Sequence, residues 1–230
     1  MIKRKTFYDD GFQEHLVEGA NFLGEEGIPE LLNIQNTEQP RALIPFTKLR
    51  TSQTKRGYVH FYTHDKYFKQ IFGSTDKYVE LLKQFDGVIS PDPTIIVGKS
   101  KCLHAVSTYM NRAIGYYFQK QGIPVIPNVR WGDESTYSFA FLGVPKKSIV
   151  AISTHGCIKR DSENSNFLRD CFKKGLTEML RQLEPRMVIV HGFMPDEIFK
   201  QHMDKTNFVR YPSEFEESRK KGGLEYGIVL

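Results

Sequence analysis

Two predicted strands that each run directly into a cluster of polar side chains constrain this chain most. Residues 123–130 and 148–154 are rich in β-branched residues and follow turn signals at Gly122 and at residues 143–147. The polar groups that follow are Asn128, Arg130, Trp131, Asp133 and Glu134 after the first strand, and Ser153, Thr154, His155 and Cys157 after the second. In a parallel α/β sheet, ligands bind at the carboxyl ends of the strands. The sequence therefore predicts the place of a site without predicting its chemistry.

Strands alternate with helices over most of the chain, which predicts an α/β fold. Further strand patterns lie at residues 42–46, 57–63, 87–90, 187–192 and 207–211, and long amphipathic helices at residues 102–121 and 165–183. Asp65 is expected to cap a short helix over the apolar residues that follow it. We therefore expect a mostly parallel sheet with helical cover. The helices are fewer than the eight of a full TIM barrel, so an irregular TIM-barrel-like sheet and an open sheet are both consistent with the pattern.

Residues 1–40 are weakly patterned, and residues 41–230 are expected to form a single α/β domain. The chain has 230 residues, 40% of them hydrophobic, which is sufficient for a substantial core. No apolar run approaches the length of a membrane span, so no membrane partner is expected. The three cysteines lack paired spacing, which favours a reducing cytoplasm over a disulfide framework.

Four long motifs, in order, resemble those of one protein family. They are FDGVISPD at residues 85–92, YMNRAIG at 109–115, GIPVIPNVRWGD at 122–133 and SIVAISTHGCIK at 148–159. Together they resemble the domain of unknown function 4417 family over roughly residues 40–215. The resemblance implies a protein of phages and other mobile elements and brings no established activity.

Asp92 and the residues around Arg130 are the sharpest candidates for chemistry. Asp92 lies between two prolines, which hold its carboxylate in place as either a catalytic group or a turn residue. Arg130 can bind phosphate, and Trp131 offers a stacking face. Asp133 and Glu134 suit a general acid or base, or a cation ligand, or they pair with Arg130 to close a loop.

Four further polar residues are candidates with weaker sequence support. Ser153 or Thr154 beside His155 suggests a nucleophile and its base, although adjacency seldom gives the geometry. Arg112 interrupts an otherwise apolar helix and is expected to support the site or face solvent. His155 can approach His191 if their two strands are neighbours. No third and fourth ligand follow at zinc-like spacing, so no metal site is predicted and the cofactor stays unknown.

Two functions from different classes follow from these residues. The first is an enzyme, a hydrolase or a group transferase acting on a nucleotide or nucleic acid, with Asp92 or Glu134 as base, His155 as acid and Arg130 on the phosphate. The alternative is a non-catalytic nucleotide- or nucleic-acid-binding protein of a mobile element. The net charge of +5 and the basic segment at residues 48–56 are compatible with both. The sequence does not indicate an oligomeric state.

Overall fold

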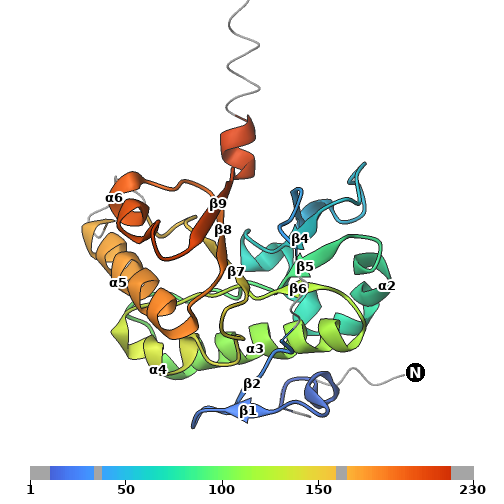
Figure 1. The fold of residues 1–230 in the computed structure, drawn as a ribbon. Coiled ribbons are helices and arrows are strands. Elements are labelled where there is room, and N and C mark those ends of the chain that lie inside the picture. Colours follow the sequence, from blue (N-terminus) through green and yellow to red (C-terminus); the bar gives the residue numbers. More distant parts are fainter. Residues whose placement is uncertain (1–10, 34–37, 159–164, 219–230) are drawn as a thin grey trace, which may run out of the picture.

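Two parallel sheets, joined edge to edge, form the body of the protein (Figure 1). A computed structural model describes residues 11–33, 38–158 and 165–218. The first sheet has four parallel strands in chain order: β3 (Leu43–Pro45), β4 (Tyr58–His60), β5 (Gly87–Ile89) and β6 (Val125–Ile126). The second sheet has three: β7 (Ile149–Ser153), β8 (Met187–His191) and β9 (Asn207–Tyr211). The prediction of a mixed α/β fold with a parallel sheet is confirmed.

A short bridge links the two sheets and makes them one curved surface. Asn128, just beyond β6, pairs with Ala151 of β7, and the amide of Val129 donates to the Ala151 carbonyl at 2.8 Å. The inner faces of both sheets share one apolar cluster, formed by Tyr58, Tyr62, Ile89, Ile126, Ile149, Ala151 and Ile189. Among the described residues the strands form no closed barrel, so the structure is a barrel-like curve with open edges.

Helices cover the outer faces of the sheets, as expected. The long helix α3 (Lys101–Lys120) and the short α2 (Val79–Leu82) pack on the first sheet. The helices α4 (Tyr137–Ala140), α5 (Ser165–Leu183) and α6 (Asp196–Phe199) pack on the second. Figure 1 shows α3 running beneath both sheets and α5 beside β7 to β9. None of the described helices is long and apolar enough to cross a membrane.

The segment before β3 is packed against α3, although its sequence is weakly patterned. It contains the two-stranded hairpin of β1 (Phe22–Leu23) and β2 (Ile28–Pro29). Leu16 and Ile28 are fully buried, and the amide of Leu31 donates to the Gly143 carbonyl at 2.9 Å. The weak pattern arises because these residues bury single side chains rather than a periodic face.

Two expectations about secondary structure are wrong. The strand expected over residues 123–130 is paired as β6 for two residues only, because Pro124 and Pro127 lack amide donors. The helix expected after Asp65 is replaced by two 3-10 turns, Asp65–Tyr67 and Lys69–Phe72. The Asp65 carboxylate does not cap the turn. It accepts hydrogen bonds from Thr94, at 3.1 Å from the amide and 2.6 Å from the hydroxyl.

Candidate functional site

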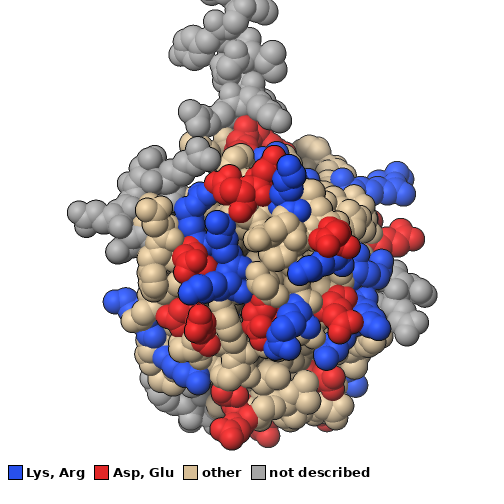
Figure 2. Space-filling model, turned by 60° about the vertical axis from the view of Figure 1, so that its left-hand side comes forward, with Lys and Arg blue, Asp and Glu red and all other residues tan. Residues whose placement is uncertain are grey.

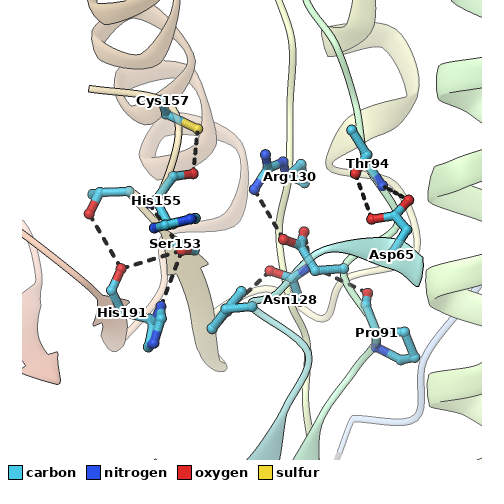
Figure 3. Close-up of polar contacts among 12 residues, drawn as sticks. Asp65, Pro91, Thr94, Asn128, Arg130, Ser153, His155, Cys157 and His191 are labelled. Atoms are coloured by element: carbon cyan, nitrogen blue, oxygen red, sulfur yellow. Dashed lines mark hydrogen bonds and ion pairs between the residues drawn. The ribbon is translucent and has the colours of Figure 1, made fainter. Parts of the chain in front are cut away.

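The carboxyl ends of the strands carry a set of polar side chains, most of which are buried. Because the strands of the two larger sheets are parallel, β4 to β9 end at the same edge of the curved surface. Their ends carry His60, Tyr62, Asp92, Asn128, Arg130, Ser153, Thr154, His191 and, after β9, Glu214. Figure 3 shows Asn128 and Arg130 on one side of this edge and Ser153, His155 and His191 on the other.

Asp92 is the centre of the first group. Its carboxylate accepts a hydrogen bond from the side-chain amide of Asn128 at 2.8 Å and one from Arg130 at 3.0 Å. The Tyr62 hydroxyl donates to the other end of the Asn128 side chain at 3.1 Å. Asp92 is buried, and the Arg130 side chain is 21% exposed, so this ion pair has one face toward solvent. The expectation that Asp92 is rigidly held is consistent with these contacts.

Helix α3 fixes this group from behind. Arg112 is 1% exposed and donates to the backbone carbonyls of Leu142, Ala140 and Asn128 at 3.0, 3.0 and 2.9 Å. Asn111 donates to the Pro91 carbonyl. Every nitrogen of the Arg112 side chain is therefore occupied by protein groups. Arg112 therefore positions the loop that holds Asn128.

Burial and charge act in opposite directions on the Asp92–Arg130 pair. Burial raises the pKa of Asp92, while Arg130 and the bond from Asn128 oppose that rise. Asp92 raises the pKa of Arg130, so the guanidinium stays charged. Burial alone lowers the pKa of Arg112 to about 9. Arg130 is thus a fixed cation, and burial makes its partner Asp92 easier to protonate than an exposed aspartate.

A small pocket opens beside Arg130. It has a volume of about 210 Å³ and is lined by residues 94–97, 130–132, 156–157 and by Leu168, Cys171 and Phe172. The Nε atom of Arg130 is buried and has no hydrogen-bond partner. An apolar pocket with a guanidinium at its wall suits a ligand that carries both a flat apolar part and an oxyanion. A larger pocket, of about 710 Å³, lies at the opposite, amino ends of β4 to β6.

The second group is built on β7 and β8, whose ends are neighbours. Ser153 pairs in register with His191, and its hydroxyl lies 3.3 Å from His191 Nδ1. The Thr154 hydroxyl donates to the Phe193 carbonyl at 2.7 Å. His155 is exposed, and its backbone amide donates to the Ser153 hydroxyl at 3.2 Å. The imidazole ring that the Ser153 hydroxyl contacts is therefore that of His191, and its sequence neighbour His155 contacts it through the backbone amide only.

The structure does not bring Trp131, Asp133 and Glu134 into the Asp92 network. Trp131 is 8% exposed and packs on Phe172, and a Cβ added to Gly175 would lie 2.1 Å from its ring. Asp133 caps the next turn by accepting from the Ser135 amide at 3.0 Å. Glu134 is exposed and lies 3.6 Å from Lys174. Only an edge of Trp131 reaches the small pocket, so most of its stacking face is occupied by the core.

Sequence reasoning missed three residues of the second group. His60 and Tyr62 lie in and just after β4, and Glu214 lies after β9. The rings of His60 and His191 are 4.7 Å apart between centroids, and Tyr62 stacks on His191 at 4.8 Å. The rule that sites follow strand ends, applied to residues 57–63, would have found His60. No pattern in the sequence indicates that Glu214 folds back onto these strands.

Comparison with known proteins gives a family. The family described as domain of unknown function (DUF4417) matches residues 20–212 of the chain. The protein belongs to this family. The match begins twenty residues before the stretch that the motifs indicated, at the segment that packs on α3.

Two curated relatives of the chain are phage proteins. It is 28% identical over 164 residues to the Gene 1 protein of Mycobacterium phage L5, a match that covers 71% of this chain and 68% of the phage protein. It is 27% identical over 165 residues to the Gene 1 protein of Mycobacterium phage D29, covering 72% of this chain and 58% of that protein. No solved structure matches the chain. The family is thus phage-associated.

Proposed function

We propose that this protein is an enzyme that hydrolyses or transfers a group on a phosphorylated nucleotide, bound at the carboxyl ends of β5 to β8. The single observation that carries the proposal is the buried Asp92–Arg130 pair, held at 3.0 Å beside an apolar pocket. Arg130 would bind a phosphate oxygen, and the pocket would take the flat part of the nucleotide. The reducing cytoplasm, where the three free cysteines stay thiols, is the expected place of action.

Asp92 and His155 are the proposed proton carriers. A buried carboxyl whose pKa is raised by burial can accept or donate a proton near neutral pH more readily than an exposed one. His155 is exposed, and its charge acts on that of Asp92. An imidazole on one side of a ligand and a fixed carboxyl on the other is an arrangement that suits acid–base catalysis.

The surface favours a small substrate over a long nucleic acid. Figure 2 shows Lys and Arg side chains interleaved with Asp and Glu over one face of the molecule. Three of the four basic residues of α5 are paired: Arg169 with Glu197, Lys174 with Asp170, and Arg181 with Glu178. A duplex-binding face would carry an unpaired basic stripe instead. Non-catalytic nucleotide binding at the same pocket is the second candidate, which the same geometry supports.

Turnover of a substrate panel by the wild type and four variants tests the proposal. Nucleoside mono-, di- and triphosphates and short single-stranded oligonucleotides would be incubated with the protein, and products followed by phosphorus NMR. We expect D92N, R130M and H155A to lose roughly 100-fold or more in turnover. The matched control is E134Q, because Glu134 is exposed and, in the part of the chain that the structure describes, forms an ion pair with Lys174 alone. It should keep wild-type turnover.

Three outcomes separate the candidates. Turnover that falls in D92N and R130M but not in E134Q supports the enzyme. Saturable binding by the wild type that R130M abolishes, with no turnover of any substrate, would leave only the binding function. Turnover in D92N, R130M and H155A that equals that of the wild type would show that the chemistry lies elsewhere.

A further inference from the structure

Glu214 is held between two buried histidines at the ends of β4 and β8. One carboxylate oxygen of Glu214 lies 3.2 Å from Nε2 of His60, and the other lies 3.9 Å from Nε2 of His191. The His60 and His191 side chains are each 2% exposed, whereas that of Glu214 is 39% exposed. The histidines therefore belong to the body of the protein, and the carboxylate reaches them from the outside.

The hydrogen bonds of His60 determine where its proton lies. The backbone amide of Tyr62 donates to His60 Nδ1 at 3.2 Å, so Nδ1 is an acceptor and the ring is neutral. A neutral imidazole with an acceptor Nδ1 carries its proton on Nε2. His60 therefore directs an N–H group at Glu214.

His191 has a nitrogen with no partner. Its Nδ1 contacts the Ser153 hydroxyl, but Nε2 is buried and makes no hydrogen bond. The Ser153 hydroxyl reaches both His191 Nδ1, at 3.3 Å, and the His191 carbonyl, at 3.4 Å. In the tautomer in which Ser153 donates to Nδ1, Nε2 of His191 carries a proton that faces the second oxygen of Glu214. A buried N–H without a partner costs free energy, so its persistence indicates a group that is built for a ligand.

We infer that His60 and His191 form an oxyanion-binding subsite for a phosphate group of the substrate, and that Glu214 occupies it in the ligand-free protein. Both Nε2 atoms present donors to one point, and a phosphate offers oxygens at the spacing of a carboxylate with more acceptor sites. This inference rests on the proposed function and extends it. The substrate would carry a second anionic group, bound away from Arg130.

Two further observations identify Glu214 as an occupant rather than part of the receptor. The family match ends at residue 212, so it includes both histidines and excludes Glu214. A mostly apolar pocket of about 490 Å³ lies next to it, lined by Ser213, Phe215 and Glu216 on one side and by residues 154–156, Ile158, Gly192 and Phe193 on the other. Gly192 in the wall of this pocket directly follows His191 in the chain.

The same three residues also have the composition of a metal site, since their ligand atoms lie within 4.8 Å of one another. The amide of Tyr62 argues against that use. A metal-bound histidine donates a proton from its other ring nitrogen to an acceptor, whereas His60 Nδ1 faces a donor. Coordination through His60 Nε2 would leave this ring without either proton. The geometry thus favours an anion over a cation.

Titration with inorganic phosphate tests the subsite in the full-length protein. The histidine rings are followed by long-range proton–nitrogen NMR in the wild type, E214A, the double variant E214A/H191F and the control E217A, whose exposed side chain lies on the same turn. We expect E214A to bind phosphate at least tenfold more tightly than the wild type or E217A, with shifts at both Nε2 atoms. The double variant, which keeps a ring beside Tyr62 but has no N–H, should lose that gain.

Other results would overturn the inference. Phosphate affinity of E214A equal to that of the wild type excludes the subsite, as does a gain that persists in E214A/H191F. Uptake of one Zn²⁺ by the wild type through the two Nε2 atoms, lost in E214A, would establish a metal site instead. If E214A fails to fold, E214Q replaces it, because glutamine keeps the side-chain volume. We expect E214Q to gain phosphate affinity over the wild type as well, but less than E214A. Failure here with normal loss of turnover in R130M would leave the proposed function intact.

Discussion

The two groups of polar residues at the strand ends differ in how completely their hydrogen bonds are satisfied. On the first sheet, Asp92 and Asn128 are bonded to side chains, and Arg112 behind them donates from all three nitrogens to backbone carbonyls. The unpartnered nitrogen of this group is Nε of Arg130, at the wall of the small pocket. On the side formed by β8 and the segment after β9, His191 leaves a buried nitrogen unpartnered, and the nearest oxygen of Glu214 is 3.9 Å away.

The difference shows which side is built for stability and which for exchange. The bonded network of Asp92, Asn128 and Arg112 makes one structure rigid, because a change in it leaves a buried polar group unpaired. An incompletely bonded group is less costly to rearrange, which a site needs if its occupant leaves when a ligand arrives. The two groups meet at Tyr62, which donates to Asn128 and stacks on His191.

The largest expected effect is on the satisfied side. R112M removes the guanidinium that donates to the carbonyls of Leu142, Ala140 and Asn128, and we expect a loss of roughly 3 kcal/mol or more in unfolding free energy. Urea denaturation monitored by circular dichroism measures it. R181A is the control, because Arg181 is exposed and pairs only with its own helix neighbour Glu178. Equal stability of R112M and R181A would contradict the division between the two sides.

A smaller, pH-dependent effect is expected at Glu214. Although burial raises it, hydrogen bonds, first of all the one from His60, bring the pKa of Glu214 down to about 2, below its ordinary value of 4.5. A lowered carboxyl pKa stabilises the fold above pH 4.5, and the contribution is lost as the pH falls toward 2. After allowance for solvent, we expect E214Q to lose roughly 1 kcal/mol at pH 6.

Urea denaturation of the wild type and E214Q between pH 6 and pH 3 checks this sign. The two stabilities should converge as the pH falls. A difference that is constant over this range would show that the carboxylate gains nothing from the histidines.

The smallest effect is expected where the two sides meet. Y62F removes the hydroxyl that donates to Asn128 and keeps the ring on His191, so we expect a loss of about 1 kcal/mol. A double-mutant cycle of Y62F with H191F sharpens the comparison, because the stacking contact is present in both single variants. Coupling near zero is expected, and a strong coupling would mean that the two sides act as one network.

The position of the site followed from local sequence patterns. Apolar, β-branched runs that end in polar clusters predicted where the strands lie in the chain, and parallel strands place those clusters at one edge. This rule led to Asp92, Asn128, Arg130 and Ser153 because each follows a strong strand signal. It also put Asp133 and Glu134 in the site, since a sequence does not show at which residue the chain turns away into the next helix.

Which side chains meet was decided by the tertiary structure. Trp131 stands next to Arg130 in sequence, yet its ring packs into the core because Gly175 of α5 leaves room for it. His60 lies more than one hundred residues before His191 and Glu214 in the chain. Only the curvature of the two sheets brings the three side chains within reach of one another. Hydrophobic patterning acts over a few residues, so the sequence by itself determined the strands, the helices and the edge that carries the site. The contacts between distant polar groups depend on sheet curvature and packing, which no local pattern encodes.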